Sequence, residues 1–277
     1  MGDLDFFRKF ARSAGTDDKG CEPDKEQPTR HCFVLCRAAE PDNLSRASQI
    51  TARVFGRGHS AEVAKKNIVT VKRGKNIVGY LAHVPTPIPN HEAEEYADGN
   101  PIWPNGKDEA AKHLSHVIVT NFGGEEQTPI ESAISVSCLA LVALELFDGI
   151  GVYWGNARVC NSREVFEDFC EVISDEQLPV PVWLRFQLVH VSDNENGFYT
   201  LGMNQFGLME IEVDRHRMKP EELFDFVSNL ANYLIQNGPV IEDGNTVGGS
   251  EDERIVVHHR PSMVEPIRRV YKIEFEG

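Results

Sequence analysis

The sequence has little cysteine and a deficit of positive charge. Six cysteines in 277 residues are too few for a disulfide scaffold, and none has the CxxC spacing typical of a zinc site. Lysine and arginine number 28 against 43 aspartate and glutamate, which gives a net charge of −15. This charge repels phosphate backbones and anionic headgroups, so the composition disfavours nucleic-acid and polybasic membrane partners. We therefore expect reduced thiols, a cytoplasmic protein and no bound metal or cofactor.

The sequence also lacks the common signatures of secretion and phosphate binding. The first 15 residues have only a brief apolar patch, so we expect no secretory signal. No P-loop, dinucleotide-binding or nucleophile-elbow pattern occurs, which disfavours kinases, P-loop proteins and α/β-hydrolases. One apolar run, residues 130–147, carries Glu131 and Glu145 near its ends. These charges favour a buried helix over a membrane span.

The order of predicted elements indicates an α+β protein. Residues 1–30 are predicted to be a flexible N-terminal segment that starts with a short amphipathic helix. Residues 31–128 are predicted to follow a β-α-β-β-α-β order, and the elements predicted in residues 149–277 repeat it. This order is typical of a four-stranded antiparallel sheet with both helices on one face. We therefore expect two ferredoxin-like halves joined by a buried helix at 129–148, with residues 31–277 as one compact unit.

Capping residues place three helices with particular clarity. Thr128, with Pro129 and Glu131 behind it, forms a capping box that begins the linking helix. Asn161 is predicted to cap a second helix, and a third runs from Lys219 to a stop at Gly238. Residues 180–191 alternate like one continuous strand.

Histidine and cysteine positions favour structural roles. The tightest grouping of several histidines is His83, His91, His113 and His116. The last two lie at a predicted helix-strand junction, which does not aim two imidazoles at one ion, so we expect structural histidines. Cys32 and Cys36 lie on one strand face about 13 Å apart, too far for a disulfide, and are expected in the core.

Two segments contain candidate ligand-binding residues. In VYWGN, adjacent aromatic rings point to opposite faces of a strand, so one of them is a candidate ligand contact. Glycines 202 and 207 enclose a predicted tight turn, and an acidic strand face follows it. We interpret this face mainly as solvated and balanced by cations such as Arg185 or Lys272. The candidate ligand-binding set is Tyr153, Trp154, Asn156, Asn204, Glu210 and Glu212.

Several separated motifs resemble one family. The motifs are HVPTPIPNHEAEE, VYWGNARV, YTLGMNQFGLMEIEV and GNTVGGSEDERIVVHHRPS, in that order. They resemble the bacterial domain-of-unknown-function family 4261, and the likeness runs from about Cys32 to the C-terminus. The resemblance implies a bacterial cytoplasmic protein, and it implies no activity, substrate or catalytic residue.

Two functions of different classes are compatible with the sequence. The first is a non-enzymatic module that binds a small ligand or a protein, with the acidic charge favouring a basic partner. The alternative is an enzyme or metal protein whose histidines and carboxylates are gathered between the two halves. The sequence leaves open whether the protein is an enzyme, and its oligomeric state.

Overall fold

The computed structural model describes residues 31–41, 43–65, 67–124, 127–174, 177–248 and 254–276. The predicted flexible segment 1–30 lies outside the described residues. The described chain divides into two compact units, one that ends at Arg185 and one that begins at Phe186. The sequence instead predicts two halves that are joined by the helix at 129–148.

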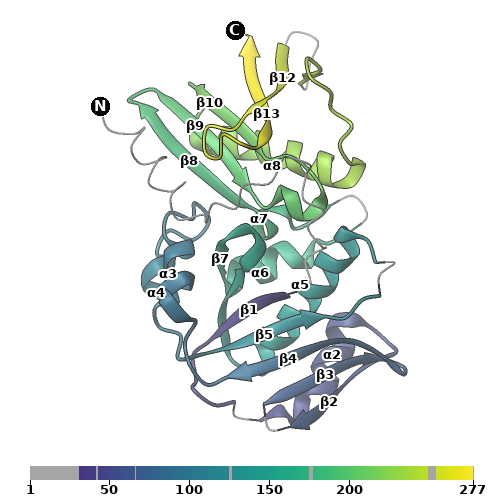
Figure 1. Ribbon diagram of the computed structural model, residues 1–277. Helices are drawn as coiled ribbons and strands as arrows, with labels where there is room; N and C mark the ends of the chain where they lie inside the picture. The colour runs from purple at the N-terminus through teal and green to yellow at the C-terminus, as the bar shows by residue number, and fades with distance from the viewer. Residues whose placement is uncertain are drawn as a thin grey trace. The chain divides into compact units, whose positions relative to one another are not determined.

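The first unit is built on a seven-stranded sheet with the order β2-β3-β4-β5-β1-β6-β7 (Figure 1). Every pair of neighbouring strands in this sheet is antiparallel. The strands are β1 His31–Cys36, β2 His59–Lys65, β3 Ile68–Arg73, β4 Asn76–Val84, β5 Ser115–Asn121, β6 Gly149–Trp154 and β7 Val159–Ser162.

Strand β1 explains why the unit extends past the linking helix. On one side it pairs with β5, Cys32 opposite Val119, and on the other with β6, Val34 opposite Val152. The residues of β6 and β7 were expected in the second half, but these two strands complete the first sheet. The two four-stranded ferredoxin-like halves are therefore not confirmed, whereas the mixed α and β composition with two sheets is.

The linking helix was predicted closely. Helix α5 spans Pro129–Leu146, and Thr128 and Glu131 form the capping box at its start. It packs on β1, β4, β5 and β6 of the sheet, and Leu139 and Leu144 are fully buried. By length and composition α5 is the one helix among the described residues that could cross a membrane. Because it packs on the sheet, we assign it to the core of the first unit.

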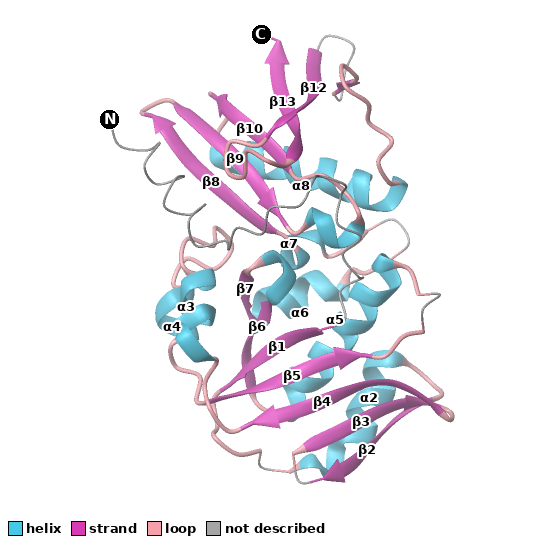
Figure 2. Cartoon of the chain, viewed as in Figure 1, coloured by secondary structure: helices cyan, strands magenta, loops and turns pink. Residues whose placement is uncertain are grey.

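Shorter helices complete the first unit (Figure 2). They are α2 Ala47–Phe55, α3 Glu92–Ala97, α4 Gly106–Ala110, α6 Arg163–Glu171 and α7 Val180–Trp183. Ser162, rather than the predicted Asn161, caps α6 by accepting from the backbone N–H of Val165. The predicted strand at 180–191 is wrong in its first part, because residues 180–183 form a helical turn that buries Trp183.

The second unit contains a six-stranded mixed sheet with the order β11-β12-β13-β10-β9-β8. Its strands are β8 Arg185–Ser192, β9 Glu195–Leu201, β10 Ile211–His216, β11 Thr246–Val247, β12 Arg254–Pro261 and β13 Arg269–Glu276. Strands β10 and β13 are parallel, and helix α8, Pro220–Asn237, lies between them in the chain. Phe224 and Phe226 of α8 pack on aromatic rings of this sheet.

The turn between β9 and β10 has the predicted form. Residues 203–206 make a 3-10 turn between Gly202 and Gly207, whose φ angles are 111° and 73°. Both angles lie in the left-handed region that glycine adopts without steric cost. The turn therefore requires the two glycines that marked it in the sequence.

Candidate functional site

The two faces of the seven-stranded sheet are buried to different extents. One register row, Cys32–Val119–Leu81–Val69, faces the helices, and all four side chains are fully buried. The next row, Phe33–Ile118–Ala82–Ile68, points to the opposite face because side chains alternate along each strand. These four side chains are only partly buried.

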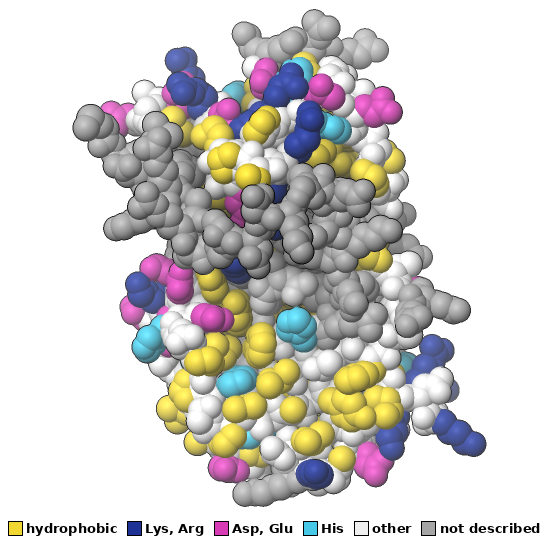
Figure 3. Space-filling model, viewed as in Figure 1, with side chains coloured by type: hydrophobic (Ala, Val, Ile, Leu, Met, Phe, Trp, Pro, Cys, Tyr) yellow, Lys and Arg dark blue, Asp and Glu magenta, His cyan; other side chains and the backbone are white. Residues whose placement is uncertain are grey.

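A second row lies beside the first on this face. It consists of His31, Thr120, Tyr80 and Thr70, of which Thr70 is buried. Phe122, which follows β5, is 52% exposed and meets the Tyr80 ring edge-on at 5.0 Å. We call the two rows together with Phe122 the open face. Figure 3 shows hydrophobic side chains gathered over β3, β4 and β5, where the open face lies.

Helices α3 and α4 cover the adjoining end of the same side of the sheet. Both pack on β7, and Ala93 of α3 and Trp103, from the connection between the two helices, join Leu35 and Tyr153 in a buried cluster. Gly151 permits this contact, because a Cβ there would lie 3.2 Å from the Trp103 ring. The helices thus bury one end of this side, and Phe33 of the open face packs against the edge of this cluster.

An aromatic stack links the covered end to the open face. The Tyr153 ring stacks on Phe33 and on Tyr96 of α3, with both centroid distances 5.7 Å. The guanidinium of Arg185 lies over the Tyr96 ring, 5.7 Å from its centroid. The Tyr153 hydroxyl donates to Glu92 at 3.4 Å, and burial raises the pKa of this phenol. Tyr153 is 5% exposed, so it packs against α3 and supports the neighbouring open face.

The other two candidates in this segment lie in different surroundings. Trp154 is fully buried on the helix-facing side, where its ring stacks on Trp183 at 6.3 Å. Asn156 is half-buried in the short 3-10 turn Gly155–Ala157 after β6. The strand alternation therefore separates Trp154 from Tyr153, as the sequence predicted.

Three buried histidines of the first unit make hydrogen bonds to the protein. His83 pairs with Ser115 Oγ at 3.0 Å, and His113 Nε2 accepts from the Ile88 N–H at 2.9 Å. His116 Nδ1 lies 2.8 Å from the Thr86 carbonyl oxygen, to which it donates. Burial lowers the pKa of His83 and of His116, so both imidazoles are neutral at pH 7. Among the described residues no three His, Cys, Asp or Glu side chains are grouped to hold a metal ion.

The described cysteines are poorly suited to nucleophilic chemistry. Burial raises the pKa of Cys36 to about 12 and that of Cys138 to about 11. It raises the pKa of Cys32, Cys160 and Cys170 as well. The thiolate is the reactive form of cysteine, and a raised pKa keeps these side chains in the protonated thiol form.

In the second unit, the acidic strand face is a buried ion network. Glu212 and Lys272 are 4% and 5% exposed, and their charged groups lie 3.0 Å apart. Lys272 also pairs with Asp214, while Ser262 donates to Glu212. The Met263 N–H donates to the other oxygen of Glu212 at 3.0 Å. The prediction of a solvated face is wrong at Glu212, although Lys272 is the cross-strand cation that was expected.

Glu210 has a different partner set from Glu212. It precedes β10, and its carboxylate accepts hydrogen bonds from Thr200 Oγ1 at 2.7 Å and from the Gly202 N–H at 2.8 Å. The Met203 N–H donates to it as well. Despite these bonds, burial raises the pKa of Glu210 to about 7. The half-buried Asn204 lies inside the turn that Glu210 holds.

The six sequence-derived candidates therefore fall into two separate sets. Tyr153, Trp154 and Asn156 belong to the first unit, and Asn204, Glu210 and Glu212 to the second. Sequence reasoning missed Ser262, whose hydroxyl bonds Glu212 from 50 positions away in the chain. It also missed the open face, although alternating apolar residues in β3, β4 and β5 gave a signal for it.

Comparison with known proteins gives one match. A family model described as a domain of unknown function (DUF4261) matches residues 199–274. Searches of curated proteins and of solved structures found no match. The family resemblance is thereby confirmed for a segment that contains Glu210, Glu212, Ser262 and Lys272.

Proposed function

We propose that this chain, whose residues 199–274 belong to the DUF4261 family of unknown function, is a non-enzymatic protein-binding module with a regulatory role. The observation that carries the proposal is the open face. A sheet normally buries its apolar face against another layer, and exposed apolar patches mark interaction sites. Here Phe33 and Ile118 lie opposite each other on neighbouring strands and Tyr80 lies in the adjoining row, and the residues that the structure describes bury all three only in part.

The aromatic stack supports the same proposal. Phe33 is held by Tyr153, which is held in turn by Tyr96 and Glu92. A side chain that is already ordered loses little entropy on binding, so such rings are effective anchors at interfaces. Tyr153 thus acts as a positioning residue for Phe33.

Charge favours a basic protein partner for this acidic chain. The net charge of −15 attracts partners of opposite charge, and this attraction weakens as salt is added. A small molecule is the other ligand class compatible with the proposal. The proposed setting is the cytoplasm of a bacterium, as the family resemblance implies.

Two matched substitutions test the use of the open face. Ile118→Thr and Ile267→Thr make the same chemical change, but Ile118 lies on the open face and Ile267 is an 83% exposed residue of the second unit. Full-length variants would be used to capture crosslinked partners from the source cells, followed by titration with the purified partner. We expect Ile118→Thr to weaken binding about tenfold or more, since burying an isoleucine contributes about 1.5–3 kcal/mol. Equal binding by both variants and the unaltered protein would refute the proposal.

An enzyme or metal protein is the second candidate, favoured by the ion network of Lys272, Glu212 and Asp214. Buried charged groups of this kind occur at catalytic sites as well as in structural networks. Elemental analysis and an absorption spectrum of the purified full chain separate the two functions. A stoichiometric metal or a cofactor band would favour this second candidate.

A further inference from the structure

The edges of the two sheets are protected unequally. An edge strand presents unpaired backbone N–H and C=O groups, and natural proteins block such edges with charge, proline, bulges or short length. Among the described strands, the edges of the first sheet are β2 and β7, and those of the second sheet are β8 and β11.

Three of these four edges are blocked. Strand β2 carries Glu62 and Lys65, and its register shifts at a bulge between Val63 and Lys65. Strand β7 has four residues and β11 only two. Each is too short, too charged or too irregular to template a further strand.

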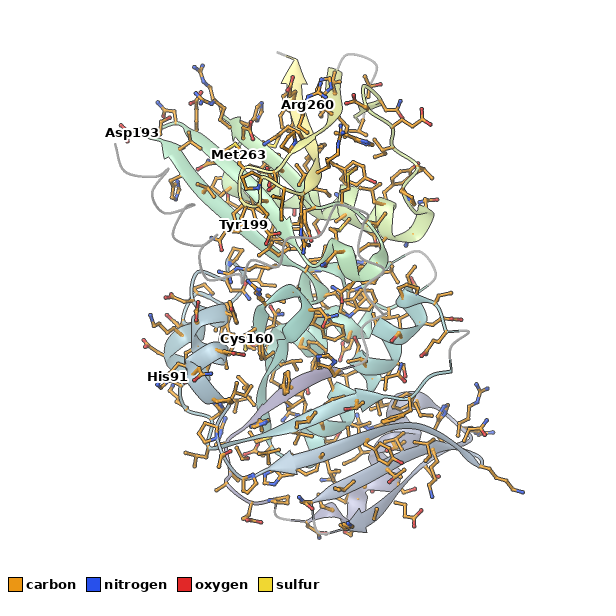
Figure 4. The ribbon with its side chains drawn as sticks, in the orientation of Figure 1. His91, Cys160, Asp193, Tyr199, Arg260 and Met263 are labelled. Carbon is orange, nitrogen blue, oxygen red and sulfur yellow. The ribbon has the colours of Figure 1, made fainter. Side chains whose placement is uncertain are left out.

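In the part of the chain that the structure describes, strand β8 lacks these protections after its first residue, Arg185. It is eight residues long, and from Phe186 to Ser192 it contains no proline, lysine, arginine or carboxylate. Leu188, Val189 and Val191 are half-buried, so apolar side chains line its length. Figure 4 labels Asp193, the first charged residue after the strand, at the turn that leads into β9.

We propose that β8 is a self-association edge, which pairs antiparallel with β8 of a second copy of this chain. The two-fold axis passes through Val189, and the two six-stranded sheets become one continuous sheet. A two-fold interface uses the same surface on both copies, and an antiparallel pair of identical strands satisfies this condition.

The side-chain pattern of β8 fits pairing with β8 of a second copy. Pairing about Val189 sets Val189 opposite itself, Leu188 opposite His190 and Gln187 opposite Val191. Within Phe186–Ser192 the pairing sets no two carboxylates and no two lysines or arginines opposite each other. Opposite charges across a strand pair are stabilising and like charges are not. The same operation on β2 about Glu62 would place two glutamates face to face, so β8 is compatible with two-fold pairing and β2 is not.

The central position makes a sharp test possible. Since Val189 is its own partner, Val189→Lys places two ammonium groups opposite each other, and Val189→Glu places two carboxylates there. A mixture of the two variants places lysine opposite glutamate and removes the repulsion. The matched control is Val63→Lys on β2, an equally non-conservative change on a blocked edge whose valine is 43% exposed.

The measurement is the molar mass of the full chain by light scattering and sedimentation over a concentration series. We expect a two-copy species for the unaltered protein and for Val63→Lys, and at least a tenfold higher dissociation constant for each Val189 variant alone. The equimolar mixture of Val189→Lys and Val189→Glu regains the two-copy mass. Circular dichroism confirms that each variant keeps the fold, and the mixture decides the question even if one variant is less stable.

Two results would overturn the proposal. One is a single-copy mass for the unaltered protein at every concentration. The other is a two-copy species that persists in Val189→Lys, or that is lost in the charged variants and not regained on mixing. Loss of the two-copy species on Ile118→Thr instead would assign self-association to the open face.

Discussion

Lys272 carries the most consequential charge in the second unit. Its ammonium group lies between Glu212, which is buried with it, and Asp214, which is half-exposed. Taking ions out of water costs several kcal/mol each, and their mutual attraction offsets that cost only while both partners are present. The network therefore fixes the loop after β12, through Ser262 and the Met263 N–H, without adding much net stability over an apolar core.

Removing the lysine should destabilise the second unit strongly. Lys272→Met leaves the Glu212 carboxylate buried without its cation, at a cost of about 3 kcal/mol in unfolding free energy. Lys219→Met, at an exposed lysine 3.9 Å from Glu222, should cost about 0.5 kcal/mol or less. Urea unfolding followed by far-ultraviolet circular dichroism measures both. A small effect at Lys272 would mean that water reaches Glu212 and solvates it.

Glu210 predicts a pH dependence of stability. Its pKa is about 7 in the folded protein, against an ordinary 4.5, so between these values the folded state binds more protons than the unfolded state. Stability should therefore fall as pH rises from about 4.5 to 7, by about 2 kcal/mol once partial exposure is taken into account. Glu210→Gln removes this titration. The free energy of unfolding should fall less between pH 5 and pH 8 for Glu210→Gln than for the unaltered protein. An equal fall would contradict the assignment of this pH dependence to Glu210.

At the scale of elements, end residues decide where a helix or strand begins. Ser162 rather than Asn161 begins α6, since Asn161 is fully buried and accepts from the Asn100 side chain. The segment 180–183 has the alternation of a strand but turns as a helix, and there Trp183 donates to Ser137 of α5 at 2.8 Å. Tertiary contacts thus overrode local pattern at both places.

The cap of α6 gives an element-scale prediction. Ser162→Ala removes the acceptor of the Val165 N–H, and we expect a loss of about 1 kcal/mol in the stability of the first unit. Ser162→Thr keeps the hydroxyl and should retain most of the stability. Tryptophan fluorescence during urea unfolding measures the effect, and an unchanged midpoint in Ser162→Ala would show that water replaces the cap.

At the scale of the whole molecule, the division into two units has a spectroscopic consequence. All three tryptophans, Trp103, Trp154 and Trp183, lie in the first unit. Fluorescence therefore reports the unfolding of that unit alone, whereas circular dichroism reports both units.

We expect the two signals to give different midpoints in urea, because two units with separate cores need not unfold in one step. Lys272→Met should lower the circular dichroism midpoint and leave the fluorescence midpoint in place. Coincident transitions that move together in this variant would show that the units unfold as one.

Much of the local structure was predictable because its causes are local. The capping box of α5, the glycine-bounded turn at 202–207 and the hairpin between β3 and β4 each depend on residues adjacent in sequence. Strand β2 was missed because most of its side chains are exposed and it lacks the alternation of a half-buried strand. The Ser262–Glu212 bond was beyond prediction, because its partners are 50 positions apart.

The sequence by itself determined the mixed α and β character of the protein, the burial of Cys32 and helix α5, and the family resemblance of residues 199–274. Only the tertiary structure decided that β1 accepts β6 as a neighbour, which sets the unit boundary at Arg185. It also decided that Glu212 is buried with Lys272 and that Phe33 lies on an open face. The reason is that strand pairing joins segments by backbone hydrogen bonds, which every residue except proline can form, so the choice of neighbours depends on the packing of the whole sheet.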